Sequence, residues 1–259
     1  MNSKLVRVSS RYKAHQSDSN CDFTYELGAS QVTESVKSLT PIRFTCTRLF
    51  RNIYNPINTL SFKNTHNNQL HWITIPEGNY TAAQIIHTIN NELTSLAQTN
   101  QEPIQFTMEL IEEDIFQFKR PASWTGDLLI LGTGLAMFIG IPADGFLIIS
   151  NDTAHINHNG RVDLSGPSPI YIQSQILASS NCVDSSQLGG SIPLIMSIPN
   201  TVPFGHTLDW EANDAQSLTV SWPMSISVRS IDIQLTDRFG NILSLPSNIH
   251  PDILFKMTY

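Results

Sequence analysis

The chain has 259 residues, of which 41% are hydrophobic and 14% are charged, and its formal net charge is −7. This length and apolar content allow one large domain, or a domain with an insertion, around a sizeable core. The acidic balance excludes the clustered lysines and arginines of a nucleic-acid-binding protein. The most basic stretch, Arg43–Arg51, spaces its arginines between apolar residues. We therefore expect no specific nucleic-acid partner.

Neutral polar residues replace the missing charges. Serine, threonine, asparagine and glutamine make up about a third of the chain, whereas ordinary soluble domains hold roughly 25% charged residues. A surface with few charges is poorly protected against self-association, because few like charges repel each other. Two interpretations stay open: a β-rich protein whose strands and turns favour serine and threonine, or a surface that is buried against copies of the chain or a partner.

The first 75 residues alternate extended stretches with polar turns, a pattern typical of β-structure. We expect strands at about 4–10, 22–27, 36–49, 59–62 and 70–75. The start of the chain, Met1-Asn2-Ser3-Lys4, lacks the apolar core of a signal peptide, so we expect no leader.

The pattern changes at residue 76. Thr81 and Gln84 stand three residues apart, as in a capping box, and Ile85, Ile89 and Leu93 follow at helical spacing. This predicts a helix over about 81–98. Strands at about 104–110, 114–118 and 128–131 and a short helical turn at 135–139 follow. We interpret 76–142 as an inserted strand–helix module between 1–75 and 143–259.

The rest of the chain again has short extended segments. We expect strands at about 146–149, 162–164, 170–177, 192–198, 218–221, 225–235, 242–245 and 253–259. The alternation in 225–235 slips between Val228 and Ile231, which indicates a β-bulge. In the last stretch, Ile253, Phe255, Met257 and Tyr259 share one face. Short strands with proline, glycine and asparagine turns and one long helix predict an all-β sandwich.

The stretch Leu128–Ile141 is the most apolar part of the chain. It is about fourteen residues long and contains Gly132, Gly134 and Gly140. A membrane span needs about 18 or more apolar residues. We therefore assign this stretch to the core and expect no membrane span.

Cys21, Cys46 and Cys182 are far apart in the sequence and form no Cys-x-x-Cys pair. Reduced thiols are expected here, and a disulfide framework or zinc site is not. Two histidines, His155 and His158, are the best candidates for metal ligands. The asparagine-rich residues around them indicate a loop, and no cysteine or third histidine lies nearby, so we predict no metal site.

Glu109, Glu112, Glu113 and Asp114 form an acidic cluster. They could bind a cation, but solvated carboxylates at a hairpin turn are the more ordinary interpretation. Paired catalytic carboxylates stay open as well, because such pairs meet through folding rather than through spacing.

Nucleotide and hydrolase motifs are absent from the sequence. The segment Gly132-Thr133-Gly134 begins like a dinucleotide-binding loop, but Met137 stands in place of the third glycine. A tight turn before a buried helix explains it better. The chain contains no Gly-x-Ser-x-Gly, Walker or His-Glu-x-x-His motif. We expect no catalytic, cofactor-binding or metal-binding residues, and no enzyme.

The tryptophans Trp72, Trp124, Trp210 and Trp222 are spread along the chain. Three of them lie beside expected strand ends, where they could line a sugar-binding groove. Packing in a core or an interface is the alternative.

Several segments, taken in order, resemble the penton (vertex) capsid proteins of virophages and polinton-like viruses. Residues Val36–Ile42 through Ile53-Tyr54-Asn55-Pro56 look like the early strands of that group. The segment Pro76–Thr81 with its helix is similar to their glycine–tyrosine–helix segment, and Leu135–Gly140 looks like the element after it. Ile226–Phe255, with Asp237-Arg238-Phe239-Gly240-Asn241 at its turn, looks like their closing hairpin.

The resemblance implies a single jelly roll that stands upright in an icosahedral shell, with an inserted small α+β module at one end. Five copies would form a homopentamer at the vertex. The other partners that it implies are a major capsid protein, built as double jelly-roll capsomers, and a host receptor. The protein would be made in the host cytoplasm and reside in the virion. A minor or cement capsid protein and a carbohydrate-binding attachment sandwich are the alternatives.

Overall fold

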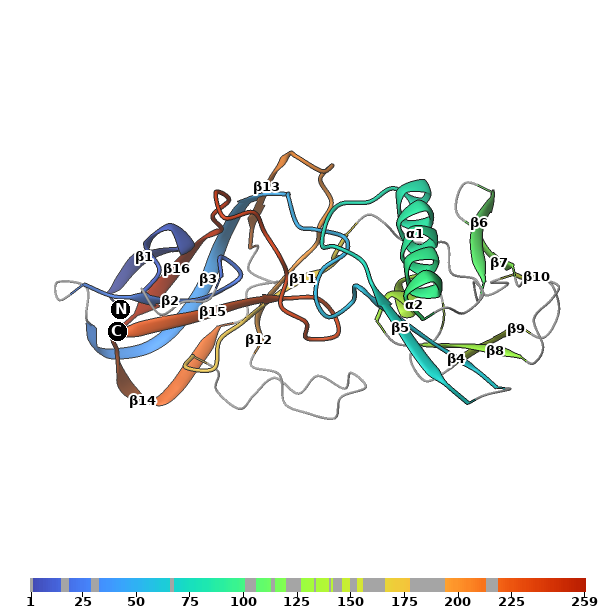
Figure 1. Ribbon diagram of the computed structural model, residues 1–259. Coiled ribbons are helices and arrows are strands. Elements are labelled where there is room, and N and C mark those ends of the chain that lie inside the picture. The colour runs from blue at the N-terminus through green and yellow to red at the C-terminus, as the bar shows by residue number, and fades with distance from the viewer. Residues whose placement is uncertain are drawn as a thin grey trace. The chain divides into compact units, whose positions relative to one another are not determined.

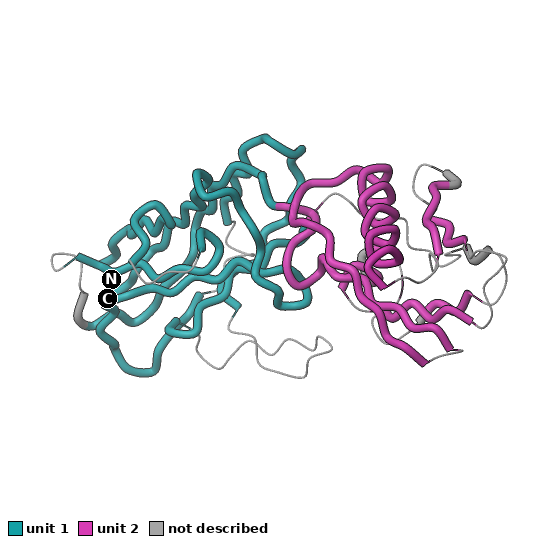
Figure 2. Tube along the Cα trace, in the orientation of Figure 1, with its two compact units in different colours: residues 1–50, 167–259 teal, residues 51–166 magenta. Residues whose placement is uncertain are grey.

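A computed structural model describes most of the chain in two compact units (Figure 2). Unit 1 comprises residues 1–50 and 167–259, and unit 2 comprises residues 51–166. The described residues are 2–14, 19–28, 33–65, 68–100, 106–112, 115–119, 127–132, 134–139, 141, 146–149, 153–155, 166–177, 194–212 and 219–259.

Unit 1 contains two antiparallel sheets (Figure 1). The first, sheet A, has the order β1-β16-β3-β13, and β14 also pairs with β3. Its strands are β1 (Ser3–Ser9), β16 (Asp252–Thr258), β3 (Thr33–Thr47), β13 (Thr207–Glu211) and β14 (Val220–Val228). The second, sheet B, has the order β12-β11-β15-β2 and consists of β12 (Leu194–Ile198), β11 (Ile170–Gln173), β15 (Ser230–Thr236) and β2 (Asp22–Glu26).

The connectivity of these sheets is that of a jelly roll. Strand β3 has 15 residues, and β13 and β14 pair with its two halves in succession, so they share one strand position. Counted along unit 1, the strand positions then follow the order 1-8-3-6 in sheet A and 5-4-7-2 in sheet B. Two sheets connected in this way form the double Greek key of a jelly roll. The predicted all-β sandwich is confirmed.

The core of the sandwich follows from strict alternation along its strands. In β15, Ile231, Ile233 and Leu235 are buried, and the residues between them are only half-buried. In β16, Phe255 and Met257 lie on the predicted apolar face and are fully buried. Sheet A and sheet B therefore enclose the apolar residues of both.

The prediction of one bulged strand over 225–235 is wrong. Strand β14 ends at Val228 in sheet A, and β15 begins at Ser230 in sheet B. The backbone oxygen of Arg229, between them, accepts a hydrogen bond from the nitrogen of Leu27. The alternation slips there because the chain passes from one sheet to the other. For the same reason β15 and β16 do not form a closing hairpin: they belong to different sheets.

The turn after β15 is organised by one carboxylate. The backbone nitrogens of Phe239 and Asn241 donate to Oδ1 of Asp237, at 2.8 and 2.9 Å, and the Asn241 amide donates to Oδ2 at 2.9 Å. Gly240 lies in the left-handed region with φ of 83°, where glycine is favoured. Asp237 is buried, so its charge is held by donors of the turn itself.

Unit 2 contains the long helix and two further sheets. One sheet has the order β5-β4-β8-β9 and the other the order β10-β7-β6. The elements are β4 (Thr59–Asn64), β5 (Leu70–Thr74), α1 (Ala82–Asn100), β6 (Thr107–Glu112), β7 (Ile115–Lys119), β8 (Leu128–Leu131), α2 (Leu135–Phe138), β9 (Phe146–Ile149) and β10 (Thr153–His155).

Helix α1 begins at the predicted capping box. The backbone nitrogen of Thr81 donates to Oε1 of Gln84 at 2.9 Å, and the nitrogen of Gln84 donates to Oγ1 of Thr81 at 3.3 Å. These two bonds satisfy donors that a helix start leaves free. The predicted residues Ile85, Ile89 and Leu93 are buried.

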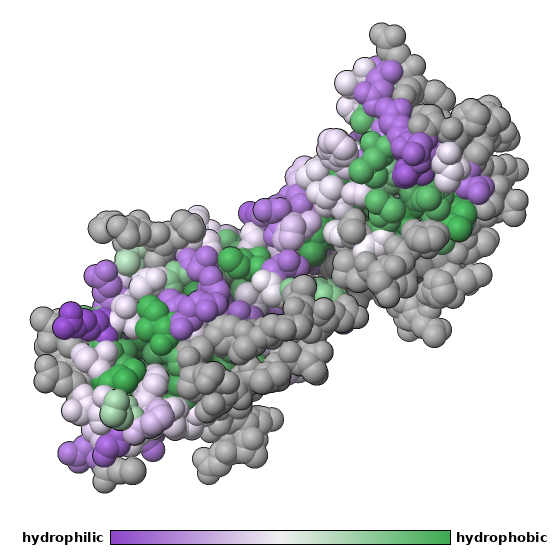
Figure 3. Space-filling view, turned by 90° about the horizontal axis from the view of Figure 1, so that it is seen from below, coloured by the Kyte–Doolittle hydropathy of each residue, from purple (hydrophilic) through white to green (hydrophobic). Residues whose placement is uncertain are grey.

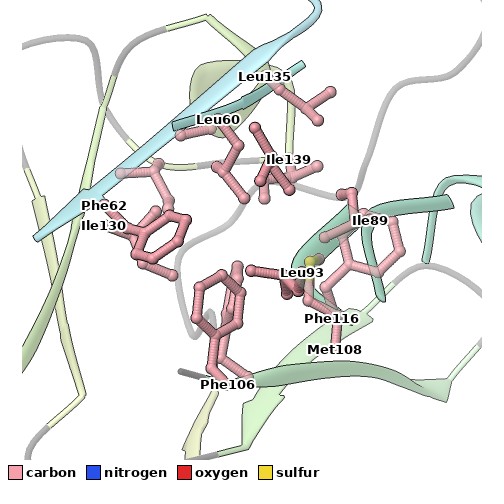
Figure 4. Packing of buried hydrophobic residues seen from close by; sticks show 14 of the residues in the cluster. Leu60, Phe62, Ile89, Leu93, Phe106, Met108, Phe116, Ile130, Leu135 and Ile139 are labelled. Atoms are coloured by element: carbon pink, nitrogen blue, oxygen red, sulfur yellow. The ribbon is translucent and has the colours of Figure 1, made fainter. Parts of the chain in front are cut away.

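The helix and the strands of unit 2 share one apolar core (Figure 4). Ile89 and Leu93 of α1 lie beside Phe116 and Met108 of the β10-β7-β6 sheet. The Asn90 amide donates to the backbone oxygen of Met108 and accepts from its nitrogen, both at 2.9 Å. One side chain thus replaces a missing strand partner for β6, which ties the helix to this sheet.

Unit 2 is wider than the inserted module expected at 76–142. Strand β4 pairs with β8 through Phe62 and Ile130, and with β5 through Leu60 and Ile73. All four side chains are buried in the core of unit 2. Residues 51–75 therefore belong with the inserted unit, since their apolar face has its partners there. The strand expected at 162–164 lies outside the described residues.

Replacing Asp237 by alanine is expected to lower the free energy of unfolding by about 2 kcal/mol, because donors of the turn lose a buried charged acceptor. Asp237→Asn keeps one acceptor oxygen and should cost less. Urea unfolding of both variants checks this. Equal stability of Asp237→Ala and the unchanged chain would contradict the role given to this carboxylate.

Candidate interaction surface

Among the described residues, sheet A ends in β1 on one side and in β13 and β14, which share one strand position, on the other. Strand β1 pairs with β16 alone, and β13 pairs with β3 alone. Unpaired backbone groups on an edge strand can bind another strand unless the edge is covered or carries charge. Both edges of sheet A carry charge, so each should reject a partner strand of like charge and can accept one of opposite charge. Sheet B also ends in two strands, β12 and β2, that pair on one side alone among the described residues.

The first edge is basic and partly apolar. Leu5 and Tyr12 are 59% and 69% exposed, although both are large and hydrophobic. They line a shallow groove together with Arg7 and Arg11. Lys4 stands beside Leu5 in the same strand. We call these five residues the β1 edge.

Arg7 is held in place by an acidic neighbour on β16. Its Nη2 lies 2.7 Å from Oδ2 of Asp252, and the pair is exposed on the arginine side. The hydrogen bond to Asp252 raises the pKa of Arg7. Close by, Oγ of Ser10 and Nδ1 of His250 are 3.1 Å apart, which anchors the turn after β1 to the residues before β16. Arg7 is thus a positioned side chain of the β1 edge, and the turn after β1 is tied to the residues before β16.

The second edge is acidic. Thr207, Asp209 and Glu211 are exposed, whereas Leu208, between them, is buried. We call these three exposed residues the β13 edge. The guanidinium of Arg43 donates to both carboxylate oxygens of Asp209, at 2.8 and 2.5 Å.

The carboxylate of Asp209 also accepts a hydrogen bond from Thr45, at 3.2 Å. The pKa of Asp209 is lowered, first by the hydrogen bond from Arg43. Glu211 lies opposite Arg43 in the register but has no ion pair among the described residues.

Sequence reasoning did not find either edge. The segment Thr207-Leu208-Asp209-Trp210-Glu211 alternates as a strand should, and this signal could have revealed β13. Alternation shows that a segment is a strand but not where in a sheet it lies. Edge position depends on the pairing of residues that are far apart in the sequence, such as Glu211 with Arg43.

A separate exposed surface lies on unit 2. In β5, Leu70 and Trp72 are exposed at 48% and 63%, and in β9 Ile148 is exposed at 47%. In the register, Lys63 lies between Leu70 and Leu129, and Leu129 lies opposite Ile148. Leu70, Lys63, Leu129 and Ile148 therefore form a row across the sheet. Figure 3 shows hydrophobic and hydrophilic side chains mixed on the visible face of unit 2.

Among the residues that the structure describes, no group of three or more histidine, cysteine, aspartate or glutamate side chains could hold an ion. Of the candidate metal ligands, the structure describes the side chain of Glu109 alone. Glu109 forms an ion pair with Lys119 of the neighbouring strand. Glu113, Asp114 and His158 lie outside the described residues.

The Gly132–Gly134 segment precedes the short helix α2, as the tight-turn interpretation predicted. Gly134 has φ of 52°, and a Cβ atom built on it would lie 2.4 Å from the backbone oxygen of Thr59. Glycine is therefore required here by the close approach of β4, which is a packing reason and not a nucleotide-binding one.

The tryptophans divide among different surfaces. Trp210 and Trp222 are partly exposed on strands of sheet A, and Trp72 is exposed on unit 2. Trp124 lies outside the described residues. Trp222 borders a groove with Thr40, Ser221 and Met224.

Comparisons with known proteins give one structural likeness to report. No family model matches the chain, and no curated protein matches it. Among solved structures, the crystal structure of the mavirus penton protein is similar over 99% of both chains, with a TM-score of 0.44 and 10% sequence identity. No helix in the described residues has the length and apolar character to cross a membrane.

Cys21 and Cys46 are free and buried in unit 1. Burial raises the pKa of both thiols, to about 12 for Cys46. A thiol with a raised pKa holds little of the reactive thiolate near neutral pH.

In a Cys182→Ser variant, these two thiols should stay unlabelled by a disulfide reagent at pH 8 while the protein is native. Both should react at once in denaturant, which serves as the control. Rapid labelling of the native protein at either cysteine would contradict the buried positions.

Proposed function

We propose that this chain is a structural capsid protein that forms the pentameric vertex, or penton, of an icosahedral virion. The observation that carries the proposal is the jelly-roll connectivity of unit 1, an architecture found in viral capsid domains. The segments that resemble virophage and polinton-like penton proteins support the same assignment. The role is assembly and not catalysis.

Assembly requires that each copy presents two different surfaces. A ring with five-fold symmetry is closed by heterologous contacts, so one face of a copy meets another face of the next. Unit 1 has two unlike edges of sheet A, and these meet this requirement. Such an obligate contact buries on the order of 2,000 Å² or more.

The insertion has an apolar core of its own. Unit 2 is connected between Phe50 and Pro167. In this proposal unit 1 forms the ring and contacts neighbouring capsomers of a double jelly-roll major capsid protein. Unit 2 supplies contacts of its own, with a host receptor as the candidate partner, and the protein resides in the virion after synthesis in the host cytoplasm.

The native mass of the full-length protein tests the proposal. We expect a species of five chains by light scattering and native mass spectrometry. A trimer would instead favour a cement or attachment role, and a monomer that also fails to co-assemble with the major capsid protein would contradict the vertex assignment.

Replacing residues 51–166 by a short flexible linker should leave the oligomer intact, because both edges of sheet A belong to unit 1. Removing only 76–142 should cause aggregation, since β4 and β5 would lose β8 and α1 and expose Phe62 and Ile73. Sedimentation of both deletion variants checks this. Dissociation of the first variant into folded monomers would place the contacts in unit 2.

A carbohydrate-binding attachment role is the alternative, based on the exposed tryptophans. Trp72→Ala and Trp222→Ala should leave glycan-array signals unchanged if the proposed structural role is correct. Binding that is present in the unchanged chain and lost in either variant would favour the attachment role.

A further inference from the structure

We propose that the β1 edge of one copy of the chain docks against the β13 edge of the next copy. This inference rests on the self-assembly proposed above and names the two surfaces that make the contact. It is argued from the pairing of the strands, their charges and their exposed apolar side chains.

The free side of β1 suits a strand-like partner. The strand has seven residues and contains no proline, so each of its residues keeps a backbone N–H group for pairing. The exposed Leu5 and Tyr12 supply apolar area, and arginine and tyrosine are types enriched in interfaces. Two exposed hydrophobic side chains beside two arginines are typical of a contact that becomes buried.

Charge decides which partner fits. Pairing two copies of β1 with each other would bring Lys4 and Arg7 of one copy close to the same residues of the other. Pairing two copies of β13 would gather Asp209 and Glu211 of both copies. Like charges opposite each other destabilise a strand pair, so both symmetric contacts are disfavoured. Pairing β1 with β13 places basic residues against acidic ones.

Part of each charge set is already neutralised within the chain. Arg7 is paired with Asp252, and Asp209 with Arg43. Lys4, Arg11 and Glu211, in contrast, form no ion pair among the described residues. Arg11 and Glu211 are exposed and supply charge without an ion pair, although Glu211 also interacts electrostatically with Arg43. Lys4 is half-buried and, by alternation with Leu5, lies on the opposite face of β1.

The acidic residues of the neighbouring strand β2 do not cancel the β1 edge on the outer face of sheet A. Asp22, Thr24 and Glu26 alternate with the buried Phe23 and with Tyr25, so the two carboxylates lie on the outer face of sheet B. Asp22 there accepts a hydrogen bond from Gln234 at 3.3 Å.

A contact between unlike edges is heterologous, and its repetition gives a closed ring or an open filament. Charge complementarity therefore links the strand order of sheet A to the kind of assembly that the chain can form. The charges disfavour a symmetric dimer through either edge.

A charge exchange in the full-length protein tests the contact. The variants are Lys4→Glu with Arg11→Glu, the single change Glu211→Lys, and all three together. Lys37→Glu is the matched control, because it reverses an exposed charge on β3, which β16 separates from β1 in the same sheet. Self-association is measured by sedimentation across a dilution series at about 0.05 M and about 0.5 M salt.

We expect the double variant and Glu211→Lys each to weaken self-association by about tenfold or more at low salt. The triple variant should recover most of the loss, and the control should change little. High salt should reduce the differences. Circular dichroism and thermal unfolding establish that every variant is folded.

Two results would overturn the contact while leaving the vertex assignment intact. The first is a pentamer whose self-association is the same in every charge variant. The second is a triple variant that self-associates no more strongly than the double variant and Glu211→Lys. If the triple variant recovers self-association but the assembly is a trimer, the contact is retained and the vertex assignment is rejected. An unchanged chain that stays monomeric with and without the major capsid protein would reject both.

Discussion

Strand β3 is the element on which the rest of unit 1 depends, because three different strands hydrogen-bond along its 15 residues. Strand β16 pairs along one of its sides, and β13 and β14 pair along successive parts of the other. A strand with partners on both sides leaves no free edge in the middle of a sheet. Among the described residues, the free edges of sheet A are therefore β1 on one side and β13 with β14 on the other, and β1 and β13 differ in charge.

The same strand determines where the insertion occurs. The chain leaves sheet A at the end of β3, forms unit 2, and returns to sheet B at β11. Unit 2 fills this connection with its own core, so its helix and strands add a second hydrophobic cluster and leave the jelly roll complete. This division explains how a jelly roll can carry an additional surface without changing the pairing of its strands.

Polar groups in the turns preserve this architecture. Asp232 of β15 accepts hydrogen bonds from the backbone nitrogens of Gln175 and Ile176, at 2.7 and 3.0 Å. Asn20 donates to the backbone oxygen of Ile249 at 2.7 Å. Each of these side chains satisfies backbone groups of a turn that is far away in the sequence, which is where an all-β fold with long connections needs support.

The sequence by itself determined the local structure: the helix with its capping box at Thr81, the alternating strand at Ile253–Met257, and the β-rich class. These features depend on neighbours within a few residues, so their patterns are visible in the chain. The slip at Val228 was visible too, but only the tertiary structure showed that it marks a change of sheet. The positions of β1 and β13 at the edges of sheet A were likewise decided by tertiary structure, because strand order arises from pairs such as Val8 with Ile253 that are distant in sequence.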